Sequence, residues 1–433
     1  MKKYDSYKNS GIYFFPNLPA NWKVRKAKYL FKEENRPVRP EDEIVTCFRD
    51  GQVTLRKNRR TEGFTNSLKE IGYQGVRKGD LVIHNMDAFA GAIGISDSDG
   101  KSTPVYSCCT PKNNNINQYY YCYLLRFLAH SGFILSLAKG IRERSTDFRY
   151  NDFKELYLPV PSREEQDAMV AYLDSATSKI DEAIAQQQKM IDLLNERKQI
   201  IINNAVTKGL DPNVKMKPSG IDWIGDIPEG WEVMKLKHLA SLKGRIGWNG
   251  LRSEEFEETS YAYLVTGQDF VGSTINWANC YQINKKRYDE DPFIQLSNGD
   301  LLITKDGSIG KIAKVEGLDK PACLNSGIFV MKQTKTKYNQ NYLYWMLCSV
   351  VMKEYVSYTQ TGATILHLYQ NVFEQMPCII PPIDTQTSIG NFLNFECSNI
   401  ENTIKSFRNK ISLLQERKQI IINDVVTGKV KVC

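Results

Sequence analysis

The chain has 433 residues with 57 basic and 49 acidic side chains, and its net charge of +8 is compatible with a polyanionic partner without requiring one. Its ten cysteines include no CxxC pair and its four histidines stand far apart, which argues against a zinc site and against a disulfide scaffold. No apolar run is long enough to span a membrane and no signal peptide is recognisable. We therefore expect a protein of the reducing cytoplasm that makes no membrane contact and holds no metal.

An internal repeat organises the chain. The segment LLNERKQIIINNAVT, which begins at Leu193, matches LLQERKQIIINDVVT, which begins at Leu413, at twelve of fifteen positions and an offset of 220 residues. The tripeptide SGI at 10–12 recurs at 219–221, upstream of a tryptophan in both cases. Such a repeat predicts a tandem of two similar units.

Each half contains the same predicted elements in the same order. The segment GDLVIHNMDAFAGAIGI from Gly79 and its counterpart GDLLITKDGSIGKIAKV from Gly299 favour strand, turn and strand. Tyrosine-rich helical patterns follow at 118–138 and 340–358, and strand-like segments that end in proline follow at 156–161 and 376–382. Each half therefore predicts a globular domain of the α/β (α+β) class.

A long helix is predicted after each proline-terminated strand. The first would cover 162–209, roughly 70 Å at 1.5 Å per residue if unbroken. A narrow apolar stripe on each helix favours an antiparallel coiled coil of the two copies, which would make the molecule pseudo-twofold. The alternative is that each helix packs only on its own domain. The stripe includes Leu173, Ile180, Ile184, Ile191 and Leu194 in the first helix and Leu393, Ile400, Ile404, Ile411 and Leu414 in the second.

Three consecutive isoleucines in each repeated core need more than one partner. On a helix, Ile200, Ile201 and Ile202 spread over about 200° and cannot all face one seam. The match at Ile420, Ile421 and Ile422 predicts two equivalent docking sites for two copies of another subunit. A locally thick core is the alternative.

This layout resembles the specificity subunit of Type I restriction and modification systems. The resemblance rests on a variable domain, a helix ending in LLxERKQIIIN, a second domain opening with SGIDWIGDIPEGW, and a second such helix. It implies that each variable domain reads one half of a split double-stranded DNA site. It also implies that the helices set the gap and bind two modification subunits, possibly with two restriction subunits. The implied boundaries are 1–160 and 211–380 for the target-recognition domains (211–226 being a linker), and 161–210 and 381–433 for the helical spacers.

Candidates for DNA contact are the polar and basic residues of predicted turns, although an ordinary solvated turn residue is the alternative at each position. Residues 23–158 carry 23 basic and 16 acidic side chains, whereas 231–380 carry 16 and 15, so the first domain should contribute more salt-sensitive affinity. The candidates in the first domain are Arg56, Lys57, Arg59, Arg60, Asn85, Asp87, Arg142, Arg144 and Arg149. Those in the second are Arg245, Trp248, Asn249, Lys305, Asp306, Thr361, Gly362 and Thr364.

No catalytic motif is apparent in the sequence. An adenine methyltransferase would need an Asn/Asp-Pro-Pro-aromatic motif and a glycine-rich cofactor loop, and neither occurs. We therefore predict no catalytic residues and no cofactor on this chain, with S-adenosylmethionine bound by the modification partner. A coiled-coil scaffold that binds proteins or glycans, or an enzyme acting alone, are the alternatives.

Overall fold

The computed structural model describes residues 2–59, 62, 70–137, 147–245, 251–359 and 367–432. Its contacts divide the chain into two compact units. Unit 1 comprises Met1–Gln188 and Arg408–Cys433, and unit 2 comprises Lys189–Phe407. Each unit therefore contains one sequence half together with the last part of the helix that belongs to the other half.

A four-stranded antiparallel sheet forms the centre of unit 1. Its strand order is β4-β11-β8-β9, with bounds Phe31–Glu34, Tyr106–Pro111, Leu81–His84 and Ile93–Ile95. The predicted strand, turn and strand after Gly79 is confirmed as β8 and β9, which pair Val82 with Gly94. Both faces of β8 are buried, which explains its continuous apolar run.

Shorter strand pairs and helices surround this sheet. The pairs are β1 (Tyr7–Asn9) with β2 (Asn17–Pro19), β3 (Lys23–Lys26) with β12 (Tyr157–Val160), β5 (Val45–Cys47) with β6 (Val53–Leu55), and β7 (Gln74–Val76) with β10 (Gly100–Ser102). The helices are α1 (Gln118–His130), α2 (Phe133–Ser136) and α3 (Tyr150–Phe153), with 3-10 turns η1 (Ala27–Tyr29), η2 (Arg56–Asn58) and η3 (Ala88–Ala90). The predicted helix at 118–138 is divided by Gly132, whose φ of 81° lies in the left-handed region.

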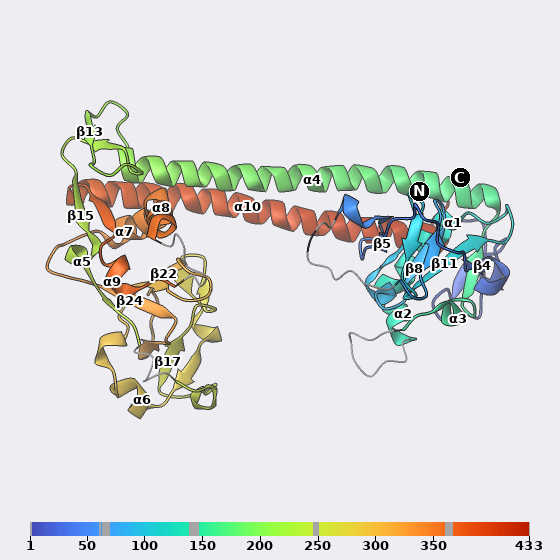
Figure 1. Ribbon diagram of the computed structural model, residues 1–433, viewed down its shortest axis with the longest axis horizontal. Helices are drawn as coiled ribbons and strands as arrows, with labels where there is room; N and C mark the ends of the chain where they lie inside the picture. Colours follow the sequence, from blue (N-terminus) through green and yellow to red (C-terminus); the bar gives the residue numbers. More distant parts are fainter. Residues whose placement is uncertain are drawn as a thin grey trace. The chain divides into compact units, whose positions relative to one another are not determined.

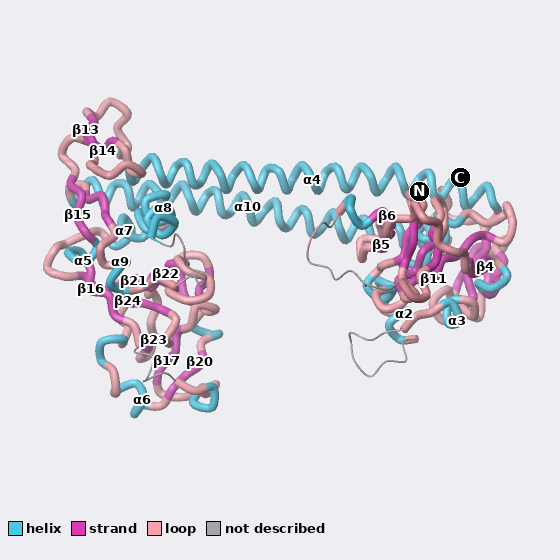
Figure 2. The backbone as a smooth tube through the Cα atoms, viewed as in Figure 1, coloured by secondary structure: helices cyan, strands magenta, loops and turns pink. Residues whose placement is uncertain are grey.

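Unit 2 repeats the central sheet and adds a second one. The repeated sheet has the order β16-β24-β21-β22, with bounds Ala240–Lys243, Ile328–Gln333, Leu301–Thr304 and Ile312–Lys314. The second sheet has the order β20-β17-β23, with bounds Tyr281–Ile283, Ala262–Val265 and Ala322–Leu324 (Figure 2). An apolar cluster combines residues of this sheet with Leu302, Ala313 and Val330 of the repeated sheet. The greater spacing between SGI and GDL in the second half is consistent with this larger second lobe.

Shorter strand pairs and helices complete unit 2. The strand pairs are β13 (Met216–Pro218) with β14 (Asp226–Pro228), β15 (Glu232–Lys235) with β25 (Pro377–Ile380), and β18 (Phe270–Val271) with β19 (Thr274–Ile275). The helices are α5 (Leu236–Leu239), α6 (Lys285–Asp289), α7 (Gln340–Leu347), α8 (Val350–Thr359) and α9 (Gln370–Phe373), with 3-10 turns η5 (Ser253–Glu255), η6 (Trp277–Asn279) and η7 (Pro292–Ile294). The predicted helix at 340–358 is divided between α7 and α8, where the amide of Val350 donates to Oδ1 of Asn203 at 2.9 Å.

The two predicted long helices are present as α4 (Arg163–Lys208, 46 residues) and α10 (Ile383–Val426, 44 residues) (Figure 1). The first begins with a capping arrangement, because the amide of Glu165 donates to Oγ of Ser162 at 3.2 Å and the amide of Ser162 donates to Glu165 at 3.0 Å. In the part of the chain that the structure describes, neither these helices nor any other is both long and apolar enough to cross a membrane.

Segments of α4 and α10 pack against each other inside each unit. In unit 1, Asp181 forms an ion pair with Lys418 at 2.7 Å, and one pocket is lined by Thr177 and Ile422 as well. Thr177 precedes Asp181 on α4 by four residues, whereas Ile422 follows Lys418 on α10 by four residues. The two helical segments are therefore antiparallel. In unit 2, Lys198 pairs with Glu401 at 2.5 Å.

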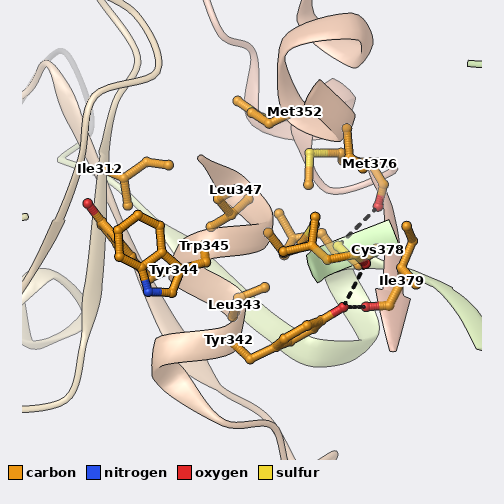
Figure 3. Packing of buried hydrophobic residues seen from close by; sticks show 14 of the residues in the cluster. Ile312, Tyr342, Leu343, Tyr344, Trp345, Leu347, Met352, Met376, Cys378 and Ile379 are labelled. Atoms are coloured by element: carbon orange, nitrogen blue, oxygen red, sulfur yellow. Dashed lines mark hydrogen bonds between the residues drawn. The ribbon is translucent and has the colours of Figure 1, made fainter. Parts of the chain in front are cut away.

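The last turns of each long helix pack into the core of the domain that the other half of the sequence forms. In unit 2, the hydroxyl of Tyr342 lies 2.8 Å from the carbonyl oxygen of Ile379 and 3.4 Å from that of Val206, at the end of α4 (Figure 3). In unit 1, the hydroxyl of Tyr120 donates to the carbonyl of Val426, at the end of α10, at 3.0 Å. The alternative that each helix packs only on its own domain is therefore wrong.

Candidate nucleic-acid interface

In unit 2, several predicted contact residues meet at one end of the central sheet. In the register of this sheet, Thr304 at the end of β21 lies opposite Ile328 at the start of β24, and Lys243 at the end of β16 lies opposite Val330. Arg245 and Lys305 follow these strands directly, so the sheet brings two residues that are 60 positions apart in sequence to the same end.

Main-chain hydrogen bonds fix the position of Lys305. Its amide donates to the carbonyl of Gly327 at 2.9 Å, and its carbonyl accepts from the amide of Leu368 at 3.0 Å. Its ammonium group lies 5.4 Å from the centre of the Phe329 ring and 3.5 Å from the carboxylate of Asp306. Asp306 also pairs with His367. This turn therefore presents two charges of opposite sign beside a histidine.

The corresponding turn of unit 1 has the same main-chain frame with different side chains. The carbonyl of Asn85 accepts from the amide of Phe148 at 3.0 Å, as that of Lys305 does from Leu368. Asn85 is only 5% exposed, and the Oδ1 of its side chain accepts a hydrogen bond from the hydroxyl of Ser107 at 3.0 Å. This burial counts against base reading by Asn85 and makes it a structural residue of the turn.

Asp87 in the same turn is held by charged neighbours. A guanidinium nitrogen of Arg49 lies 2.8 Å from its carboxylate, and its amide donates to Nδ1 of His84 at 3.1 Å. Burial lowers the pKa of His84, although the carboxylate of Asp87 opposes this effect. His84 is therefore neutral near pH 7 and adds no positive charge to this surface.

The basic residues of η2 lie beside the hairpin that connects β5 and β6. Lys57 pairs with Glu43 at 2.5 Å and Arg59 with Asp50 at 2.6 Å, while the guanidinium of Arg59 stacks 4.3 Å from the centre of the Phe48 ring. Such exposed pairs are weak, typically about 0 to 1 kcal/mol, so a phosphate can compete for these cations. Nε of Arg56 donates to Oγ1 of Thr46 at 3.4 Å.

The other predicted contact residues fall into two groups. Arg149 is exposed and pairs with Asp147 at 2.7 Å, whereas Arg245 is buried with 3% exposure, so a contact to DNA requires its side chain to leave its present position. The predicted residues outside the described part of the chain are Arg60, Arg142, Arg144, Trp248, Asn249, Thr361, Gly362 and Thr364.

Two further residues that contact these turns, Arg49 and His367, were not predicted. Arg49 reaches Asp87 from the hairpin between β5 and β6, and His367 reaches Asp306 from the segment before α9. Arg49 precedes an Asp-Gly pair between two short strands, which is a turn signal that sequence reasoning can recognise. For His367 we find no comparable local signal.

The predicted seam and docking residues differ in exposure. The buried ones are Leu173, Ile180, Ile191, Ile202, Leu393, Ile400, Ile404 and Ile422. The half-buried ones are Ile184, Leu194, Ile201, Ile411, Leu414 and Ile421. Ile200 and Ile420, in contrast, are 52% and 51% exposed, and they lie seven residues after Leu193 and Leu413, which are 47% and 65% exposed. Two exposed apolar residues at this spacing lie on one helix face in each unit.

Within the described ranges, no group of three or more histidine, cysteine, aspartate or glutamate side chains is placed to hold a metal ion. The nearby thiol of Cys47 is buried, which raises its pKa and keeps it protonated.

Comparisons with known proteins connect this architecture to one family. A family profile described as "Type I restriction modification DNA specificity domain" matches residues 228–412. The putative type I restriction enzyme MjaX specificity subunit of Methanocaldococcus jannaschii is 26% identical over 443 residues, which cover 96% of this chain and 95% of that protein. The MjaVIII specificity subunit of the same organism is 26% identical over 328 residues, or 74% of this chain and 72% of that protein.

A solved structure has the same fold. A chain from a solved structure of a type I R-M system superposes with a TM-score of 0.70 at 14% identity, and the match covers 95% of this chain and 99% of that one. The profile covers residues 228–412 and the two relatives cover 74% and 96% of the chain, so this chain is similar to the specificity subunits of type I restriction and modification systems.

Proposed function

We propose that the chain is the DNA-recognition subunit of a type I restriction and modification complex and does no chemistry itself. The observation that carries this proposal is the repeated sheet end, where one main-chain frame holds Asn85 in unit 1 and Lys305 in unit 2. A frame that stays constant while its side chains change is suited to reading two different sequences. Residues 1–160 and 211–380 are the two target-recognition domains.

In this proposal the helical spacers at 161–210 and 381–433 form an antiparallel coiled coil with pseudo-twofold symmetry. The support is that contacts recur at an offset of 220 with the helices exchanged. The pair of Lys198 and Glu401 in unit 2 corresponds to the pair of Lys418 and Asp181 in unit 1. The coiled coil sets the length of an unread gap between the two halves of a bipartite, asymmetric DNA site.

Two modification subunits complete the complex, and two restriction subunits can join it in the cytoplasm. Each modification subunit brings the methyltransferase active site and its S-adenosylmethionine. We place its docking face on the exposed pair Leu193 and Ile200 in unit 2 and on Leu413 and Ile420 in unit 1, because an apolar side chain at these positions otherwise faces water.

The test of recognition is the pattern of DNA methylation. A host that carries this chain with its modification partner should methylate a motif of two short parts separated by a gap of unread bases. Sequencing that detects methylated bases reads the motif directly. A short uninterrupted motif would count against two separate readers, and no added methylation would count against DNA recognition altogether.

The docking faces are tested by Ile200→Asp and Ile420→Asp. Burial of a carboxylate against an apolar partner is unfavourable, so each variant should lose one modification subunit, and the two together should lose both. The mass of the purified complex gives the result. The control is Asn204→Asp, because aspartate is the natural residue at the equivalent Asp424. Full occupancy in both isoleucine variants would contradict these docking faces.

A further inference from the structure

Among the described residues, no acidic side chain forms an ion pair with Arg245 in unit 2. The residue is 3% exposed. Its Nε donates to the carbonyl of Leu324 at 3.0 Å and its Nη2 to Sγ of Cys323 at 3.5 Å, while its Nη1 has no hydrogen-bond partner. In the part of the chain that the structure describes, the hydrogen-bond acceptors of this guanidinium are therefore a carbonyl and a thiol, and neither is an anion.

A buried cation of this kind is unfavourable in the free protein. Arginine keeps its proton in proteins, so neutralisation cannot relieve the burial. Buried charges are normally paired, and an unsatisfied donor on a charged group adds a further desolvation cost. A feature that weakens the fold calls for an explanation outside the folded chain.

The repeat shows what a balanced arginine looks like at the same place. In unit 1, Glu34 at the end of β4 lies opposite Cys108, as Lys243 at the end of β16 lies opposite Val330 in unit 2. Two residues further on, unit 1 has Arg36, which is the counterpart of Arg245.

Unlike Arg245, Arg36 has a buried acidic partner. It pairs with both carboxylate oxygens of Asp80, a residue that is 2% exposed, and one of these contacts measures 3.2 Å. The counterpart of Asp80 in unit 2 is Asp300, which pairs instead with Lys332 at 3.0 Å. Both units therefore have an arginine at this position, but in unit 2 the equivalent acidic residue pairs with a lysine and not with the arginine.

We propose that Arg245 is a recognition residue whose missing partner is a pair of acceptor atoms on DNA in the second half-site. Those atoms are either O6 and N7 of a guanine or two oxygens of a phosphate, since both take the fork of a guanidinium. In the free chain the Arg245 side chain is buried, and it leaves this buried position when DNA binds. The inference rests on the proposed function.

Its position and its present partners support this role. Arg245 follows β16 at the same sheet end where Lys305 follows β21. Its two present acceptors are neutral, and a thiol is a weak acceptor, whereas hydrogen bonds between a cation and an anion are roughly twice as strong as neutral ones. Exchange of these contacts for an anionic partner is therefore favourable.

The first test compares Arg245→Met with Arg36→Met in the complex with the modification subunit and in the free chain. Arg245→Met removes an unbalanced buried charge, so the melting temperature of the free chain should stay the same or rise, while affinity for the cognate DNA falls about 10- to 100-fold. Arg36→Met leaves Asp80 buried without its cation and should lower the melting temperature. A lower melting temperature with unchanged DNA affinity in Arg245→Met would make Arg245 a purely structural residue.

The second test follows the withdrawal of the side chain directly. Cys323 is fully buried beside Arg245, and Cys378, also in unit 2, is equally buried within the apolar core, where its Sγ donates to the carbonyl of Met376. Cognate DNA should accelerate alkylation of Cys323 relative to Cys378, measured by mass spectrometry of the peptides. This readout decides the case if Arg245→Met lowers both stability and affinity. An unchanged ratio of the two rates in the DNA-bound wild-type complex overturns the proposal.

A guanine partner and a phosphate partner predict different effects of Arg245→Met on DNA binding. If the partner is a guanine, Arg245→Met loses discrimination at one base of the second half-site. If it is a phosphate, affinity falls for every sequence and the slope of log K against log salt becomes shallower by about one. Failure of the wild-type complex to bind any DNA would reject the proposed function itself, which is a separate outcome.

Discussion

The contacts of the long helices are the same in both units, whereas the contacts at the two central sheet ends differ. Each helix end gives a carbonyl to a buried tyrosine, from Val206 to Tyr342 and from Val426 to Tyr120. The lysine of each repeated ERKQ segment also reaches an acidic residue of the other helix.

At the sheet ends, by contrast, equivalent positions carry different chemistry. Asn85 is a buried amide where Lys305 is a lysine, and Arg36 has a carboxylate partner where Arg245 has none within the described ranges. The main-chain bonds at these turns are nevertheless equal, at 3.0 Å in both units. Because a main-chain bond does not depend on the side chain, the turn can change its chemistry without losing its shape.

Contacts between domain and helix lie between these extremes. In unit 1 the hydroxyl of Tyr123 donates to Asp174 on α4 at 2.7 Å, and in unit 2 Nε1 of Trp345 donates to Asn394 on α10 at 2.8 Å. Trp345 stands where unit 1 has Tyr123, and Asn394 stands where unit 1 has Asp174. A hydrogen bond from the domain to the long helix is nevertheless present in both units. The two units therefore share their main-chain frame, while the side chains differ between them.

The largest expected effect comes from lengthening the helices alone. Four residues inserted within 183–188 and four within 403–408 add about 6 Å at 1.5 Å per residue, which corresponds to about two base pairs at 3.4 Å each. The methylated motif should keep its letters in both halves while the unread gap grows. Changed letters would show that the helices contribute to base reading, and an unchanged gap would show that they do not set the spacing.

A smaller effect is expected from the buried tyrosines at the helix ends. Tyr120→Phe and Tyr342→Phe each remove a buried hydroxyl and leave carbonyl acceptors without it, which should cost about 1 to 3 kcal/mol of unfolding free energy in either unit. Urea denaturation of the free chain measures this cost. A control is Tyr119→Phe, because Tyr119 is 46% exposed and should have little effect. A large difference between the two buried variants would mean that the helix ends are not equivalent.

Much of this frame could be predicted from the sequence, because it depends on periodic patterns. The predicted helix at 162–209 agrees with Arg163–Lys208 within one residue at each end, and the ion pairs of Lys198 and Lys418 recur at the repeat offset of 220 residues. The spread of three isoleucines around the helix correctly indicated that they would not share one environment, and Ile200 is exposed whereas Ile202 is buried.

The sheet ends were harder to predict, because their side chains are placed by partners that are distant in sequence. Nothing local distinguishes Asn85, which bonds to Ser107, from an exposed turn residue. Arg245 is buried with its Nε bonded to the carbonyl of Leu324, which is 79 residues away in sequence. Sequence patterns identify turns, but only the register of the strands shows which turn residues face water.

The smallest effect is expected from the matched ion pairs of the helices. In each pair the acidic partner is well exposed, at 59% for Glu401 and 56% for Asp181, so Lys198→Met and Lys418→Met should each cost no more than about 1 kcal/mol. The two costs should agree, because the pairs are equivalent in the repeat. Thermal unfolding at low and at high salt measures them, and the difference from wild type should shrink as salt screens the pair.

An exchange of charges separates the ion pair from the packing of the lysine side chain. Lys198→Glu alone places two acids together and should be less stable than Lys198→Met, whereas Lys198→Glu combined with Glu401→Lys should recover most of the loss. The same exchange at Lys418 and Asp181 is the matched experiment in unit 1. Recovery in one unit only would show that the helix contacts, like the sheet ends, have begun to diverge.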